Sequence, residues 1–232
     1  MLDSKHYWVI VLVIIVLVLL GWWYFKSMPL YTYRIKFVTM WGTPGTENII
    51  GYSMPPLEGP HTGNMFLIQH DPNFNLFRVG DYASAGIAES SMFGTNNGLI
   101  KEANGYKYYT KDVLQTPGER SFTITYDPQN PLFSFVTMIA PSSNWFTGVS
   151  SINMTGLNQS LTVGKSTGIA LYAFDAGVDH GDQFKTFPKM PREEKIPISY
   201  IKENSVLFPD SSDQIMKDAI PSFGYLHIER VA

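Results

Sequence analysis

The sequence of 232 residues contains no cysteine. Disulfide frameworks, zinc–thiolate sites, iron–sulfur clusters and cysteine nucleophiles are therefore excluded. The absence of disulfides does not assign a cellular compartment, because a domain of about 200 residues can bury enough core to be stable without them.

Charge is also scarce, at 16% of residues, and the formal net charge is −3. A chain without a polycationic surface has nothing to displace counterions from nucleic acid, so no nucleic-acid partner is expected. The sequence lacks a phosphate-binding loop and an H-E-x-x-H pattern. We therefore expect that the protein is not an enzyme.

Aromatic residues, by contrast, make up 14% of the chain, and it contains 19 glycines and 15 prolines. This composition favours a β-rich globule with many loops. Residues 31–41 alternate apolar and polar side chains, as a half-buried strand does. Further strands are expected at 64–70, 121–126, 132–140, 165–174 and 223–231.

Residues 82–103 carry apolar side chains at helical spacing, but G-T-N-N-G (94–98) interrupts them, so two short helices are expected. The stretch 185–222 contains five prolines and predicts loops and edge segments. Strands without β-α-β alternation favour an antiparallel β-sandwich with short helical insertions.

The long hydrophobic run at residues 7–25 has no charged residue. As a helix it rises about 28 Å, close to the thickness of a bilayer's hydrocarbon core. Aromatic residues lie at both of its ends, and bulky W-W-Y-F follows Gly21 where a cleaved signal peptide needs small residues. The pattern predicts one transmembrane helix and a bilayer partner.

The expected organisation is therefore a short tail (1–6), a single-pass transmembrane anchor (7–25), a linker (26–30) and one domain (31–232). Near the run's ends Lys5 opposes Lys26, which does not decide the orientation. Arg34 and Lys36 add positive charge on the carboxy-terminal side of the run, but they belong to the expected first strand.

Two segments contain the candidate cation-binding residues. They are S-F-V-T-M-I-A-P-S-S-N-W-F-T-G-V-S-S (134–151) and I-A-L-Y-A-F-D-A-G-V-D-H-G-D-Q-F (169–184). Each is typical of a buried strand that continues into a polar loop with glycine. Together they place Asn144, Asp175 and Asp179 at one end of the sheet, where oxygen ligands suit Ca²⁺. The spacing is not that of an EF-hand, and ordinary turns also contain such Asp/Gly clusters.

Neighbouring side chains have simpler roles. Trp145 and Phe146 are expected to anchor the loop against the core, although exposed aromatics there can also contact a partner. His180 and Asp182 are expected to be solvated. Sequons at Asn153 and Asn158 occur at the frequency expected by chance.

The two segments resemble the signature of the spondin amino-terminal domain family, of the F-spondin and mindin type. Residues 31–41, 55–63 and 75–94 also match it in order, so the similarity covers residues 31–232. The resemblance implies a C2-like antiparallel β-sandwich and a calcium ion bound by Asn144, Asp175 and Asp179. The family usually has aspartate where this chain has Asn144, so weaker calcium binding is expected here. Members of the family also carry cysteines that this chain lacks.

The resulting expectation is a membrane-anchored, extracytoplasmic adhesion or protein-binding module with a structural divalent cation. Its partner is a protein or a surface glycan. Two alternatives are a structural surface or envelope protein without a ligand-binding role and a metal-dependent hydrolase that uses the same acidic cluster.

Overall fold

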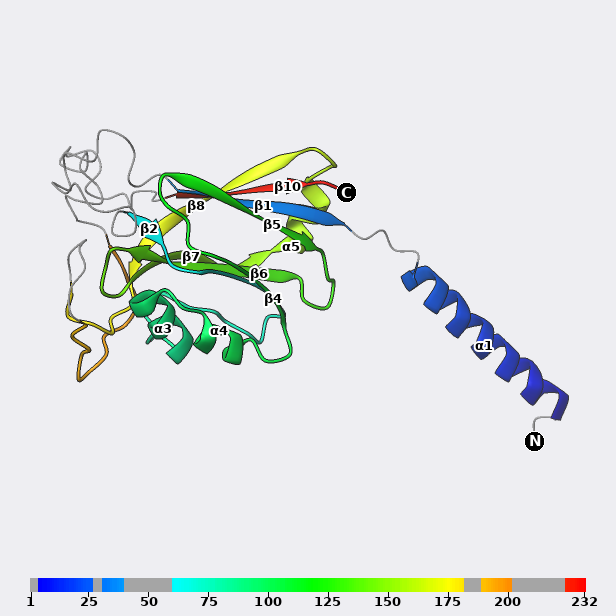
Figure 1. The fold of residues 1–232 in the computed structure, drawn as a ribbon. Coiled ribbons are helices and arrows are strands. Elements are labelled where there is room, and N and C mark those ends of the chain that lie inside the picture. The colour runs from blue at the N-terminus through cyan, green and yellow to red at the C-terminus, as the bar shows by residue number, and fades with distance from the viewer. Residues whose placement is uncertain (1–3, 27–30, 40–59, 182–188, 202–223) are drawn as a thin grey trace. The chain divides into compact units, whose positions relative to one another are not determined.

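The computed structural model describes residues 4–26, 31–39, 60–181, 189–201 and 224–232. They belong to two compact units, Met1–Tyr31 and Thr32–Ala232, which we describe separately. The first unit contains the helix α1 (Ser4–Lys26), drawn in dark blue in Figure 1. The expected linker 26–30 lies almost wholly outside the described residues.

The transmembrane helix expected at residues 7–25 is not supported and requires a correction. Among the described residues, no helix is both long and apolar enough to cross a membrane. The predicted transmembrane helix is therefore contradicted by this finding, and the single-pass anchor and the bilayer partner that depend on it are not supported.

The second unit is built on a ten-stranded sheet in which every neighbouring pair is antiparallel. The main hydrogen-bonded order is β4-β3-β6-β7-β8-β10-β1-β5, while β2 pairs with β6 and β9 with β8 (Figure 1). The strands are β1 (Thr32–Thr39), β2 (His61–Thr62), β3 (Met65–His70), β4 (Lys107–Lys111), β5 (Gly118–Thr125), β6 (Leu132–Ala140), β7 (Trp145–Asn153), β8 (Ser166–Asp175), β9 (Ser199–Tyr200) and β10 (Gly224–Arg230).

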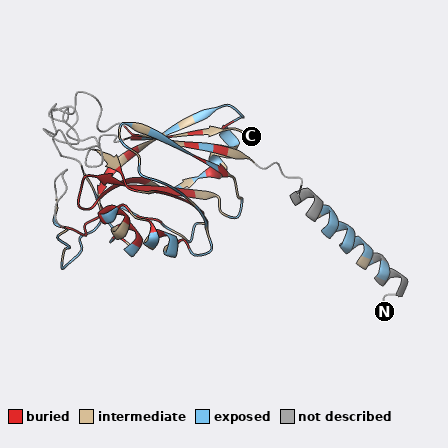
Figure 2. Ribbon diagram, viewed as in Figure 1, coloured by how far each residue is buried: buried red, intermediate tan, exposed pale blue. Residues whose placement is uncertain are grey.

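The strand β8 joins the two layers of this sheet. Its residues 166–171 pair with β10, and its residues 172–175 pair with β7. The sheet is therefore continuous, whereas a simple sandwich has two separate sheets. Between the layers, the ring of Phe135 on β6 lies 5.0 Å from Phe37 on β1 and 6.0 Å from Phe122 on β5. Figure 2 shows how completely β6 is buried in this arrangement.

The helices α3 (Ala85–Phe93) and α4 (Asn97–Glu102) confirm the two short helices predicted across 82–103. They pack on the sheet face opposite the layer of β1 and β5, where Ile87 and Leu99 join Phe66 and Phe146 in a second apolar cluster. A third short helix, α5 (Met154–Ser160), follows β7.

Two carboxylates cap this helix pair reciprocally. Glu102 of α4 accepts hydrogen bonds from the Gly86 N–H (2.6 Å) and the Ser84 hydroxyl at the start of α3. Glu89 of α3 accepts from the N–H groups of Asn97 (3.1 Å) and Gly98 (2.9 Å) at the start of α4. These bonds hold down the pKa of Glu89, led by the one from the Thr95 hydroxyl.

The substitution Glu89→Gln tests this capping. A neutral amide accepts N–H bonds more weakly than a carboxylate and interacts less favourably with the positive end of a helix. We expect the free energy of unfolding, measured in denaturant, to fall by about 1 kcal/mol. The control is Glu194→Gln, at an exposed position, which should change it little. Equal losses for the two variants would show that the cap contributes nothing.

The sequence did not anticipate β4, α5 or the extent of β7, because residues 145–151 were expected to form a loop. Within the proline-rich stretch, the described residues 189–201 contain β9 beside loop segments. Its other residues, 185–188 and 202–222, lie outside the described part of the chain.

Candidate cation site

The structure brings together all three residues expected to bind a cation. Asn144 lies between β6 and β7, and Asp175 is the last residue of β8. Trp145, the residue after Asn144, is the register partner of Asp175. Asn144 therefore lies next to Asp175 across the pair of strands β7 and β8. The Asn144 side-chain N–H group donates to Asp175 Oδ1 (2.9 Å) and to the backbone carbonyl of Asp179 (3.0 Å).

Hydrogen bonds to the Asp179 carboxylate join its loop, residues 176–181, to residues 189–196. The residue is fully buried. Its Oδ1 accepts from the Gly181 N–H (2.8 Å), and its Oδ2 accepts from the Met190 N–H (2.6 Å). Both carboxylate oxygens therefore have a backbone donor, and the loop 176–181 is held against residues 189–196.

Asp175 carries a carboxylate in a partly buried position. Burial raises its pKa above the ordinary value, because the charged form loses water. The Gly177 N–H (2.6 Å to Oδ1), the Arg192 charge and the Asn144 amide act in the opposite direction, while Asp179 adds to the rise. Its Oδ1 accepts from both Gly177 and Asn144, and neither bond uses Oδ2.

One polar atom of the site is left without a partner. The Asn144 side chain is fully buried, and its Oδ1 has no hydrogen-bond partner among the described residues. A buried carbonyl oxygen in this condition has a substantial free-energy cost. It is also the kind of oxygen that Ca²⁺ accepts as a ligand, together with carboxylate and backbone carbonyl oxygens. The oxygen types of Asn144, Asp175 and Asp179 are therefore those that a hard cation accepts, and the Asn144 amide is turned with its N–H group towards the other two residues.

The fit depends on more than carboxylates. Over the residues that the structure describes, no group of three or more His, Cys, Asp or Glu side chains could hold a metal ion. A cation here would rely on the amide of Asn144 and on backbone oxygens beside Asp175 and Asp179. These are neutral ligands, and calcium affinity falls when fewer ligands carry charge.

Two glycines allow the loop to close. Gly177 has φ of +69°, and a Cβ atom there would collide with the backbone carbonyl of Ile196. At Gly181 a Cβ atom would collide with the Ser143 hydroxyl, which donates to the Gly181 carbonyl (3.0 Å). The contacts at each position give the reason that glycine is needed there.

The predicted anchoring aromatics are confirmed. Trp145 is 2% exposed and Phe146 is fully buried, so neither side chain is available to a partner. His180 is exposed, as expected, and Asp182 lies outside the described residues. Sequence reasoning missed Ser142, Ser143 and Lys189, which surround the three expected residues. The two serines were visible beside Asn144, whereas no pattern linked Lys189 to this loop.

A histidine and a serine also meet in the core, near the start of β6. His70 Nδ1 donates to the Asp71 carbonyl (2.7 Å), so Nε2 accepts from the Ser134 hydroxyl (2.8 Å). That hydroxyl oxygen also accepts from the Ser151 N–H (2.8 Å). Both side chains are fully buried. The pair therefore cross-links β3, β6 and β7 and offers no access to a substrate.

The buried His70 makes stability depend on pH. Burial lowers its pKa below the ordinary 6.5, although the Asp71 carbonyl and charge oppose this. Above pH 6.5 both folded and unfolded chains hold a neutral imidazole, so stability is complete. As pH falls towards the folded-state pKa, only the unfolded chain gains the proton and stability is lost, by at most about 1.4 kcal/mol per pH unit.

Denaturant unfolding between pH 7.5 and 5 should show this loss for the wild type. His70→Gln should lose less over the same range, and the control His180→Gln should behave as the wild type does. An unchanged pH dependence in His70→Gln would contradict the assignment.

The geometry defines a class of protein, an antiparallel β domain with an amide and two carboxylates at one end of its sheet. The chain belongs to the spondin amino-terminal domain family, Spondin_N, which matches residues 31–215. This confirms the family expected from residues 134–151 and 169–184.

Curated relatives include Spondin-2 of Rattus norvegicus, 27% identical over 180 residues, and Spondin-2 of Homo sapiens, 25% identical over 179 residues. Each match covers 72% of this chain and 52% of the relative. The chain therefore spans about half the length of the curated relatives it matches.

Proposed function

We propose that this chain is an extracytoplasmic adhesion or protein-binding module of the spondin type, with a structural calcium ion. Asn144, Asp175 and Asp179 would hold the ion through their oxygens. Bound there, calcium would cross-link the β6–β7 connection, the end of β8 and the loop that follows it. Restricting these loops lowers the entropy that a binding surface loses when a partner docks.

One observation carries the calcium proposal. The buried Asn144 bridges Asp175 and Asp179 through its N–H group, and its Oδ1 has no partner among the residues that the structure describes. An isolated Asp/Gly turn would not need a buried amide between a carboxylate and a backbone carbonyl of the same loop. The family membership supports the module itself, since the matched residues 31–215 include the whole site.

Calcium titration of the full chain during thermal unfolding tests the ion. The midpoint should rise with calcium, corresponding to about 1.4 kcal/mol when calcium is ten times Kd. Asp175→Ala should remove the shift, and the control Asp112→Ala, exposed beyond β4, should keep it. An unchanged midpoint at millimolar calcium would end the calcium proposal.

Binding needs its own measurement, because a calcium site can exist in a purely structural protein. The purified chain should be retained on some members of a panel of extracellular proteins and surface glycans, with weaker retention in a chelator. Retention on none of them would favour the structural surface protein. Turnover of a broad ester, peptide and glycoside panel would instead favour the hydrolase.

A further inference from the structure

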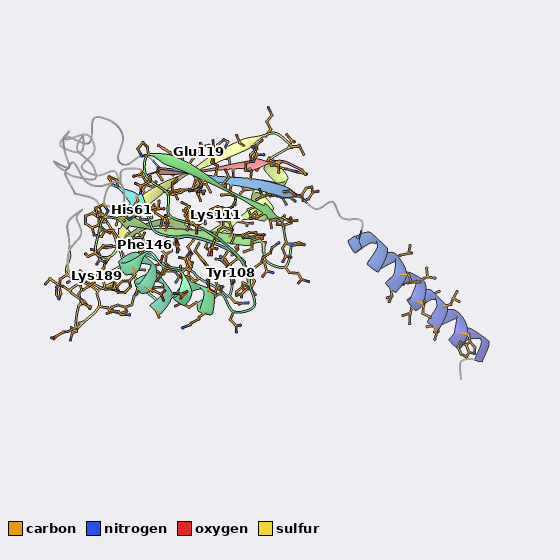
Figure 3. All side chains as sticks on the ribbon, viewed as in Figure 1. His61, Tyr108, Lys111, Glu119, Phe146 and Lys189 are labelled. Carbon is orange, nitrogen blue, oxygen red and sulfur yellow. The ribbon has the colours of Figure 1, made fainter. Side chains whose placement is uncertain are left out.

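A lysine ammonium already lies against the candidate cation site. Lys189 Nζ donates to the backbone carbonyls of Ser143 (3.3 Å) and Ser142 (3.5 Å), the two residues that precede Asn144. Its charge also lies 5.6 Å from the centre of the Phe93 ring at the end of α3. Lys189, labelled in Figure 3, thus connects the segment 189–201 to the β6–β7 connection and to α3.

The electrostatic surroundings of Lys189 are those of a counter-ion. Partial burial lowers the pKa of Lys189, and the negative charge of Asp179 opposes this. Asp179 is fully buried, and the described groups that contact its carboxylate oxygens are neutral N–H donors. Lys189 places a positive charge at the residue just before Met190, whose N–H donates to Asp179 Oδ2.

The site is therefore closed by the chain's own donors. The Asn144 amide spans Asp175 and Asp179, backbone N–H groups satisfy the Asp179 oxygens, and Lys189 binds the carbonyls of Ser142 and Ser143. Arg192 plays the corresponding electrostatic part for Asp175. A divalent ion that enters this site meets a positive charge that is already bound.

We propose that Lys189 is a resident cation of the Asn144/Asp175/Asp179 site. Its ammonium group, bound to the carbonyls of Ser142 and Ser143, places a positive charge beside the site and keeps the three surrounding segments joined without calcium. The second part of the proposal rests on the proposed function. The Lys189 charge repels calcium and so lowers the affinity of the site for it. Asn144 and Lys189 then both lower calcium affinity. Asn144 lacks the negative charge of the aspartate that the family usually has at this position, and Lys189 adds a positive charge.

Thermal unfolding in a chelator tests the first part without any calcium. Lys189→Met retains an apolar stem of similar length and removes the charge, so we expect the midpoint to fall by about 3 °C. Lys189→Arg keeps the charge, so its midpoint should lie close to that of the wild type. The matched control is Lys195→Met, an exposed lysine of the same segment, which should leave the midpoint unchanged. Equal midpoints for Lys189→Met and the wild type would overturn the proposal.

Calorimetric titration with calcium chloride tests the second part. Removing one positive charge near the ion should tighten binding about tenfold in Lys189→Met, whereas Lys195→Met should bind as the wild type does. An unchanged or weaker affinity in Lys189→Met would overturn the effect on calcium, even if the wild type binds calcium as proposed.

The two failures are distinguishable. If neither the wild type nor Lys189→Met binds calcium, the calcium part of the proposed function fails. A lower midpoint of Lys189→Met in chelator would then still support Lys189 as the resident cation. If calcium binds but Lys189→Met matches the wild type in both measurements, the calcium proposal stands and the role of Lys189 is rejected.

Discussion

Gly177→Ala should reduce the free energy of unfolding by about 3 kcal/mol, through two separate costs. The first is the backbone conformation, because φ of +69° costs a residue with a Cβ atom about 1 kcal/mol. The second is overpacking, which costs about 1–3 kcal/mol. The new methyl group would meet the Ile196 backbone carbonyl. That carbonyl cannot turn aside freely, since the adjacent Ile196 N–H donates to the Gly177 carbonyl (3.0 Å).

The matched control is Gly164→Ala. Gly164 also has positive φ (+77°), but a Cβ atom there would meet nothing within 4 Å. It should therefore lose only the conformational part, about 1 kcal/mol. Denaturant unfolding of both variants separates the two costs. Equal losses would show that Ile196 yields to the methyl group and that the loop is not closely packed.

The same pair of variants bears on the cation site. Gly177 lies between Asp175 and Asp179, so displacing it moves both carboxylates relative to Asn144. Gly164→Ala leaves that loop untouched. If the calcium proposal is correct, Gly177→Ala should also lose the calcium-dependent rise in the unfolding midpoint, and Gly164→Ala should keep it.

Strongly patterned elements could be predicted from the sequence. The apolar run 132–140 coincides with β6 (Leu132–Ala140), and the alternation at 31–41 contains β1 (Thr32–Thr39). The interruption at 94–98 correctly separated two helices, because Gly94 in the left-handed conformation ends α3. In each case the determining contacts are local in sequence, so a pattern within one segment is sufficient.

The strand β7 shows what a local pattern cannot predict. Its residues W-F-T-G-V-S-S-I-N include a glycine and serines that are typical of a loop. The pairing of β7 with both β6 and β8 overrides that tendency. Gly148 belongs in the strand because a Cβ atom there would collide with the Phe135 carbonyl on β6. Only the neighbouring strand makes this requirement visible.

The candidate site divides in the same way. Asn144, Asp175 and Asp179 could be placed together because each follows or ends an expected strand. Lys189 could not, since its role depends on the pairing of residues 177–181 with residues 190–196. Those contacts join loops, whose path is not encoded by periodicity. The acidic residues of the site could therefore be predicted from the sequence, whereas the positive charge of Lys189 beside them could not.

Phe146→Ala is the second substitution for which a large effect is expected. Phe146 is the residue after Trp145 on β7, it is fully buried, and it is labelled in Figure 3. Its ring lies 5.1 Å from Phe77 in an edge contact and 5.2 Å from Phe174 in a stacked contact. Phe174 is its register partner on β8, directly before Asp175.

Truncating this ring should lower the free energy of unfolding by about 3–5 kcal/mol, because the lost burial and the remaining cavity both contribute. Tyr82→Ala is the matched control. That aromatic side chain is 65% exposed, and its loss should cost about 0.5 kcal/mol or less. The cavity would also free the strand ends that carry Asn144 and Asp175, so calcium binding should weaken in Phe146→Ala and not in Tyr82→Ala. Comparable unfolding losses in the two variants would mean that the aromatic cluster beneath the site does not hold β7 against β8.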